Sequence, residues 1–263
     1  MTRVMGIVNV TPDSFSDGGA WLDPADAVAH AHRLVGEGAD LIDIGGESTR
    51  PGSAPVDEAT ELARVIPVVE ALAGTIGEVE ISIDTTKESV ARAAVAAGAS
   101  IINDVSASLE TVAAETGAGW IAMHTLGPSA TMQADPTYDD VVDDIHGFLT
   151  DAAARGRAAG VDRLWVDPGI GFGKTTAHNL DLVANLDRFA DIAPVLVGVS
   201  RKRFVGEIHA QSDGIPGESA VTGPDDRLEG SVALAAWSTY LGADVVRVHD
   251  VRATVHAVRV VQS

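Results

Sequence analysis

The chain has 263 residues, enough for one large domain, and we predict a single domain over residues 1–263. Its formal charge of −20 at pH 7 excludes a nucleic-acid partner, because the phosphates of nucleic acid would be repelled. The absence of cysteine excludes a disulfide framework, a thiolate nucleophile and a cysteine–zinc site.

No apolar run reaches the roughly eighteen residues of a membrane span, so no membrane partner is expected. Residues 1–3 lead into the first apolar run without the pattern of a signal peptide. The sequence therefore predicts a soluble, cytoplasmic protein.

Eight short apolar runs predict strands, and Ala-rich segments with helical spacing lie between them. The strands are expected at residues 4–10, 40–44, 79–84, 100–105, 120–124, 163–167, 195–199 and 244–249. Helices are expected at 23–36 with Asp23 as N-cap, after Thr85 or Thr86, at 56–73, at 139–159, from 225 to before 242, and at the C-terminus. Long loops are expected after the first, second, fifth and seventh strands, the last of them reaching residue 224.

Eight alternations of strand and helix predict an α/β fold, the (β/α)8 TIM barrel. Each apolar run ends in polar residues: Asn9, Asp43, Asp84, Asn103 with Asp104, His124, Asp167, Ser200 to Lys202, and Arg247 to His249. Active sites of these barrels form at the C-terminal ends of the strands. The sequence therefore predicts a site built from the whole ring of strand ends.

Three strand ends suit a flat ligand that is rich in N–H donors. Asp84, Asn103 and Asp167 would converge across the barrel mouth, where carboxylates accept paired hydrogen bonds strongly. Asp84 could instead cap the following helix, and one of Asn103 and Asp104 is expected to be structural.

The last two strands suit an anion. Arg247 and His249 alternate on one strand, so both point to the same face and fit a phosphate or diphosphate. The alternative is a surface pair between Arg247 and Asp250. Lys202 could form a Schiff base, but its two arginine neighbours favour anion and carbonyl binding.

The glycine-rich segment 167–175 does not fit a P-loop, because Pro168 stands where the first glycine is needed. Its glycines would let the backbone pass close to a flat ligand, with Phe172 beside it. Asn9, with Asp13 and Asp17, could hold Mg²⁺ together with substrate phosphates.

Residues 5–19 and 43–52 resemble the two signature loops of the dihydropteroate synthase family. The resemblance continues in order along essentially the whole chain, through residues 82–85, 102–105, 123–124, 131–133, 167–174, 200–202 and 247–250. It implies an enzyme that joins 6-hydroxymethyl-7,8-dihydropterin diphosphate to 4-aminobenzoate and releases diphosphate in folate synthesis.

The resemblance also implies roles for single residues. Asp84, Asn103, Asp167 and Lys202 would hold the pterin, with Met123 and Phe172 packing near it; Asn9 would bind Mg²⁺ with the diphosphate; Arg247 and His249 would contact the diphosphate; and Phe15, Thr49, Arg50 and Pro51 would form the aminobenzoate pocket in two closing loops. Asp84, Lys202 and Asn9 are the expected catalytic residues. The family further suggests a homodimer formed through the later helices.

Two positions depart from the family pattern, Leu126 where Arg or Gln is common and Arg203 where many members carry Ser. Two other readings remain open at this point. One is a pterin-binding carrier or regulator without synthase activity, and the other is a methyltransferase-type pterin barrel that serves a cobalamin partner.

Overall fold

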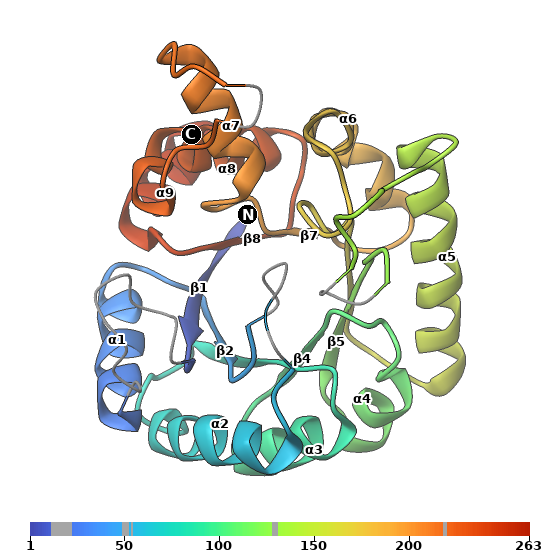
Figure 1. The fold of residues 1–263 in the computed structure, drawn as a ribbon. Helices are drawn as coiled ribbons and strands as arrows, with labels where there is room; N and C mark the ends of the chain where they lie inside the picture. The colour runs from blue at the N-terminus through green and yellow to red at the C-terminus, as the bar shows by residue number, and fades with distance from the viewer. Residues whose placement is uncertain (12–22, 49–52, 54, 128–130, 218–219) are drawn as a thin grey trace.

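The computed structural model describes residues 1–11, 23–48, 53, 55–127, 131–217 and 220–263 (Figure 1). Eight parallel strands form its sheet, in the order β6-β5-β4-β3-β2-β1-β8-β7. They are β1 (Arg3–Asn9), β2 (Leu41–Gly45), β3 (Glu80–Asp84), β4 (Ile101–Asp104), β5 (Gly119–Met123), β6 (Leu164–Asp167), β7 (Leu196–Val197) and β8 (Val245–Val248).

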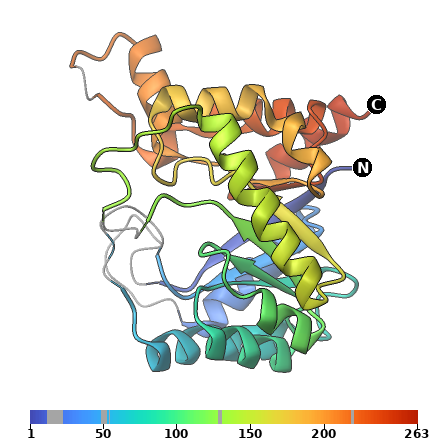
Figure 2. The same ribbon diagram turned by 90° about the vertical axis from the view of Figure 1, so that its right-hand side faces the viewer.

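A single bridge between Val166 and Val195 joins the two edges of this sheet, so the strands form a nearly closed barrel. Helices surround it, as Figures 1 and 2 show. They are α1 (Pro24–Gly36), α2 (Glu58–Leu72), α3 (Glu88–Ala97), α4 (Glu110–Thr116), α5 (Val141–Ala159), α6 (Thr176–Ala184), α7 (Arg203–Ser212), α8 (Leu228–Tyr240) and α9 (Val251–Val261). The predicted TIM barrel is confirmed.

The barrel interior is plugged by one apolar layer. Met5, Leu41, Ile101, Ile121, Trp165, Leu196 and Val245 form a buried cluster with one member from each of seven strands. Because side chains alternate along a strand, the residue two positions further on faces the same interior. Those residues include Asp43, Asn103, Met123, Asp167 and Arg247. The apolar plug therefore forms the floor of a polar layer at the C-terminal end of the barrel.

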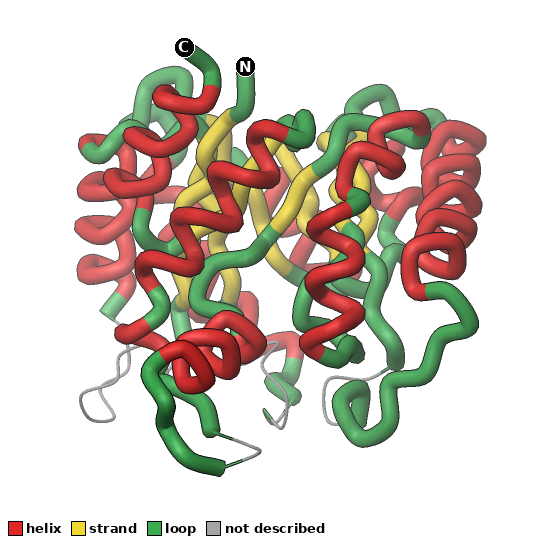
Figure 3. The backbone as a smooth tube through the Cα atoms, turned by 90° about the horizontal axis from the view of Figure 1, so that it is seen from above, coloured by secondary structure: helices red, strands yellow, loops and turns green. Residues whose placement is uncertain are grey.

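The opposite end of the barrel is closed by charged groups around Trp165. Its indole Nε1 donates to Asp244 Oδ2 over 2.7 Å, and the guanidinium groups of Arg3 and Arg163 lie 5.4 Å and 5.2 Å from the centre of the Trp165 rings. Arg3 and Arg163 both pair with Glu80. Figure 3 shows both chain termini at one end of the barrel.

The N-terminal ends of α1 and α3 can be compared with the helix caps predicted from the sequence. Asp23 caps α1 by accepting from the Ala25 N–H at 3.0 Å, as predicted. The predicted cap of α3 by Thr85 or Thr86 is wrong, because that helix begins at Glu88 with Lys87 before it. Thr85 Oγ1 instead accepts from the Lys87 N–H in the preceding turn.

The long loop predicted after the seventh strand is also wrong, since α7 occupies residues 203–212. Phe204, Val205 and Ala210 bury one face of this helix, and Arg203 pairs with Glu207 on the other. The pattern is that of an amphipathic helix, which the charged start at Arg201–Arg203 concealed. Within the described residues, no helix has the length and apolar character needed to cross a bilayer.

Candidate functional site

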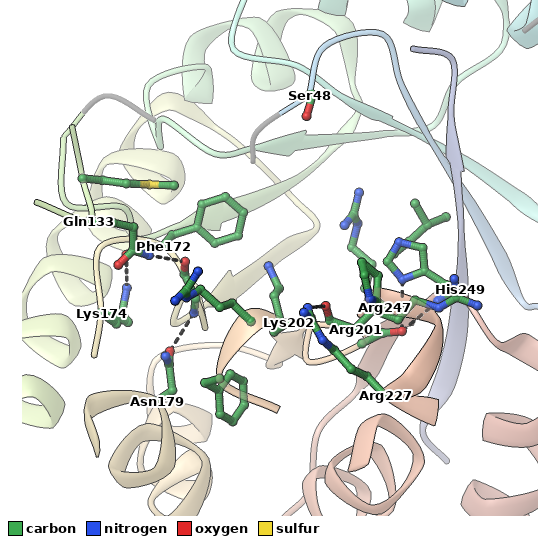
Figure 4. A pocket seen from close by; sticks show the side chains of 18 of the residues that line it. Ser48, Gln133, Phe172, Lys174, Asn179, Arg201, Lys202, Arg227, Arg247 and His249 are labelled. Atoms are coloured by element: carbon green, nitrogen blue, oxygen red, sulfur yellow. Dashed lines mark hydrogen bonds between the residues drawn. The ribbon is translucent and has the colours of Figure 1, made fainter. Parts of the chain in front are cut away.

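A cavity of about 1000 Å³ opens at the C-terminal end of the barrel (Figure 4). Its lining comes from several βα units and includes Asn9, Asp84, Phe172, Ser200, Lys202, Arg247 and His249. Beside it lies a narrow cavity of about 20 Å³, whose lining includes Asp84, Asn103, Met123, Asp167, Phe172 and Lys202. The structure thus brings together all six residues that the sequence assigned to a flat ring.

Arg247 crosses the barrel interior and binds two carboxylates. Its Nε lies 2.6 Å from Asp43 Oδ2, and its Nη2 lies 2.9 Å from Asp84 Oδ2. Asn103 Nδ2 donates to the same Asp43 oxygen at 3.0 Å. We call Asp43, Asp84, Asn103 and Arg247 the interior charge cluster. The predicted alternative, a pair between Arg247 and Asp250, is wrong, because Asp250 holds Arg201 through two hydrogen bonds.

Asp43 was predicted only as a polar strand end, with no role in binding or catalysis. It is wholly buried, and it holds both Arg247 and Asn103. The signal was present in the sequence, since Asp43 lies two residues after the inward-facing Leu41 on an otherwise apolar strand. An isolated carboxylate there would be costly, so an interior cation had to be close.

The neighbours Asn103 and Asp104 point in opposite directions from β4. Asp104 accepts hydrogen bonds from the N–H groups of Ser106, Ser108 and Leu109 and from Trp120 Nε1. Its carboxylate therefore holds the turn that leads into α4, while Asn103 faces the interior charge cluster. As predicted, one member of the pair is structural.

Burial raises the pKa of two carboxylates that line the narrow cavity. Burial raises the pKa of Asp84 to about 7, with Asp43 and Glu61 adding to the rise and Arg247 opposing it. Asp84 does not cap α3, since its Oδ2 is held by Arg247. Burial also raises the pKa of Asp167 to about 6, against the opposing hydrogen bond from the Gly169 N–H at 2.7 Å. Both groups change charge in the range in which enzymes commonly work.

Lys202 stands between the carboxylates and the larger cavity. Its Nζ lies 4.0 Å from the centre of the Phe172 ring, and Figure 4 shows it between Phe172 and Arg247. Burial and the positive charge of Arg247 lower the pKa of Lys202 to about 8, while Asp167 and Asp84 oppose that change. The ammonium group can therefore contact a ring seated against Phe172.

The turn that carries Phe172 requires glycine. Gly169 has a φ of +67°, and a Cβ there would lie 1.8 Å from the His124 carbonyl oxygen. A Cβ on Gly173 would lie 2.4 Å from Leu126 Cβ, so Leu126 packs against this turn. The glycines serve close packing of two βα loops.

Lys174 also stabilises the turn that carries Phe172. Its Nζ contacts His124 Nδ1 at 3.0 Å and donates to the Phe172 carbonyl at 2.9 Å. Burial lowers the pKa of Lys174 to about 7, and burial with the Lys174 charge lowers the pKa of His124 to about 3. His124 is therefore neutral, and it supports Lys174.

The β7–α7 loop and the end of β8 form another part of the cavity lining. His249 Nδ1 lies 3.1 Å from Ser200 Oγ, and the Ser200 hydroxyl also accepts from the His249 N–H. Arg203 lies on the rim and pairs with Glu207 at 2.9 Å. Four predicted site residues, Phe15, Thr49, Arg50 and Pro51, lie outside the described residues.

Comparison with known proteins identifies the family of the chain. A family model described as pterin binding enzyme matches residues 5–249. The dihydropteroate synthase of Escherichia coli K12 is 46% identical over 268 residues, covering 99% of this chain and 91% of the relative. The chain belongs to the dihydropteroate synthase family.

Solved structures of this family have the same fold. The Xanthomonas albilineans dihydropteroate synthase with 4-aminobenzoic acid has a TM-score of 0.89 and 47% identity, covering 99% of this chain and 92% of that one. The Yersinia pestis enzyme in a sulfonamide complex also has a TM-score of 0.89, with 45% identity and coverage of 99% and 93%.

Replacing Asp43 tests the interior charge cluster. We expect Asp43→Asn to lower the free energy of unfolding by about 3 kcal/mol. This value is the low end of the range for removing one partner of a buried ion pair, because Arg247 remains paired with Asp84 in the variant. Urea denaturation measures the loss. The exposed Asp187→Asn is the matched control and should change stability by less than about 0.5 kcal/mol. A similarly small effect of Asp43→Asn would contradict the assignment.

Proposed function

We propose that this chain condenses 6-hydroxymethyl-7,8-dihydropterin diphosphate with 4-aminobenzoate, giving 7,8-dihydropteroate and diphosphate. The observation that carries the proposal is the meeting of Asp84, Asn103, Asp167 and Lys202 at one narrow cavity beside the larger one. Carboxylate and amide oxygens there match the N–H edge of a pterin. Residues 1–263 would form one pterin-binding barrel domain.

The pterin would enter the narrow cavity and displace Phe172 and Lys202. At about 20 Å³ that cavity holds little more than one water molecule, so a bicyclic ring needs these two side chains to move. Both line the larger cavity as well, which gives them space. Met123 on β5 would then pack against the ring.

The diphosphate would lie toward Asn9, Arg247 and His249. The Asn9 side chain oxygen lies near Gly45, where a Cβ would be 3.6 Å from it, and Asn9 lines the cavity. The described residues contain no group of three or more His, Cys, Asp or Glu side chains placed to hold a metal. One amide oxygen fits Mg²⁺ that takes its other ligands from phosphates and water. Bound there, Mg²⁺ would neutralise charge on the leaving diphosphate.

The chemistry would begin with cleavage of the bond between the pterin methylene carbon and the diphosphate oxygen. The electron pair leaves with the diphosphate, toward Arg247 and His249, and positive charge spreads over the methylene and ring. Ionised Asp84 stabilises that charge. The neutral amine of 4-aminobenzoate then attacks the carbon and loses a proton to solvent. Phe15, Thr49, Arg50 and Pro51 would form the pocket for this second substrate.

We also propose a homodimer formed through the later helices. On α8, Trp237 is 49% exposed and Tyr240 is 71% exposed, and Val260 on the neighbouring α9 is 74% exposed. The centres of the Trp237 and Tyr240 rings lie 5.7 Å apart, and an exposed aromatic pair of this kind supports an interface between copies. The cytoplasmic location stays a prediction.

The reaction is tested directly by measuring diphosphate release from the pterin diphosphate with Mg²⁺. We expect release that depends on 4-aminobenzoate, because the amine completes the transfer. Tight pterin binding without turnover would identify a pterin carrier instead. A barrel that serves a cobalamin partner would bind pterin but give no 7,8-dihydropteroate.

Asp84→Asn separates ground-state binding from catalysis. We expect turnover to fall by more than pterin affinity, because the carboxylate charge matters most when positive charge develops. The gap between wild type and variant should narrow as the pH falls through about 7, where Asp84 of the wild type becomes protonated. Single-turnover kinetics and equilibrium pterin binding measure both quantities. Equal losses in turnover and affinity would refute the electrostatic role.

A sulfonamide should inhibit the enzyme in competition with 4-aminobenzoate. The residues expected to form the aminobenzoate pocket, including Phe15 and Thr49, follow the family pattern without an insertion. Complementation of a synthase-deficient host is the measurement, and growth should stop when the drug is added. Full rescue of growth in the presence of drug would contradict the prediction.

A further inference from the structure

A second charge cluster joins the β2–α2 loop to α2 and to the start of α3, and its Glu61 also raises the pKa of Asp84. Lys87, directly before α3, reaches both Glu47 in that loop and Glu61 on α2, where the Nζ–Oε2 distance is 2.5 Å. Glu61 is wholly buried, and its Oε1 accepts no hydrogen bond within the described part of the chain. A buried carboxylate on an outer helix is costly, so stability alone does not account for it.

The same cluster fixes the backbone of the loop. Gly46 packs directly on α2, since a Cβ there would lie 2.7 Å from Val65 Cγ1 and 3.0 Å from Glu61 Cγ. Arg64, one turn along α2, donates from Nη1 to the Gly46 carbonyl at 2.7 Å. Lys87 therefore holds the Glu47 side chain, and Arg64 holds the backbone of the adjacent Gly46.

The segment held in this way is a wall of the larger cavity. Glu47 and Ser48 both line it, and Figure 4 shows Ser48 across the cavity from Lys202. Neither residue lines the narrow cavity assigned to the pterin. The groups proposed to bind the diphosphate include His249, which contacts Ser200 in another part of the same lining. The wall at Glu47 and Ser48 thus faces the space left for the second substrate.

We propose that Lys87 and Glu61 are positioning residues that hold the Glu47–Ser48 wall for binding of the aromatic amine. This inference rests on the proposed synthase function. Lys87 has a second effect, because it offsets the negative charge of Glu47 on a wall that an aminobenzoate anion must approach. Burial alone would lower the pKa of Lys87, but its bonds to Glu47 and Glu61 outweigh burial and raise it. The lysine therefore stays charged at neutral pH.

Lys87→Met tests this role through the two Michaelis constants. We expect the KM for 4-aminobenzoate to rise about tenfold, as for loss of a charged hydrogen bond. The KM for the pterin diphosphate and the equilibrium Kd for pterin should change by less than about twofold, and Lys87→Arg should restore most of the aminobenzoate KM. The matched control is Arg92→Met on the helix that Lys87 precedes, which removes an equal charge from surface pairs with Glu88 and Glu115. It should leave both KM values unchanged.

Two further measurements keep the proposal testable if Lys87→Met folds poorly or if the wild-type protein shows no turnover. Glu47→Gln keeps the Lys87–Glu61 pair and should not lower Tm. Because it also removes the negative charge of the wall, hydrogen exchange and not the aminobenzoate KM is its readout. Hydrogen exchange of the amides of residues 46–48 should speed up in Lys87→Met and Glu47→Gln but not in Arg92→Met. Equal rises in both KM values, or unchanged exchange, would overturn the proposal. A wild-type protein that binds pterin without turnover would refute the proposed synthase function. Hydrogen exchange would still show whether Lys87 holds residues 46–48 in place.

Discussion

The guanidinium group of Arg247 is the interaction on which the site depends. It lies inside the barrel, where it pairs with both Asp43 and Asp84, and Asn103 shares the same Asp43 oxygen. Buried carboxylates are stable only when such a partner is fixed beside them. Because Asp84 has two acidic neighbours in Asp43 and Glu61, Arg247 only partly offsets burial, and Asp84 keeps a raised pKa.

The barrel positions this cluster by simple alternation along its strands. The apolar layer around Met5, Leu41 and Trp165 fills the interior, and the next inward-facing residues are polar. A rigid apolar floor therefore supports a charged layer that is closed to water from below. The loops add what the strands cannot supply, namely the Phe172 turn, the Ser200–His249 pair and the Glu47–Ser48 wall. Pterin, diphosphate and amine would thus be bound by different parts of one ring.

The sequence predicted the fold well because apolar periodicity and strand-end polarity reinforce each other. It also placed Asp84, Asn103, Asp167 and Lys202 together, since parallel strand ends must meet at one rim. It missed α7, whose charged first turn resembled a loop, and it gave Asp43 no role beyond ending the second strand. The role of Asp43 depends on a side chain more than 200 positions away, at Arg247, and only the closed barrel brings these two together.

The most direct test of the central claim is the titration of Asp84 in the ligand-free protein. Carbon-13 NMR of labelled aspartate side chains gives each carboxyl pKa, and Asp84→Asn assigns the resonance that disappears. The Asp84 carboxyl should titrate near 7, and Arg247→Met should move that pKa upward because its neutralising partner is lost. A wild-type pKa near the ordinary value of about 4, unchanged in Arg247→Met, would contradict the account.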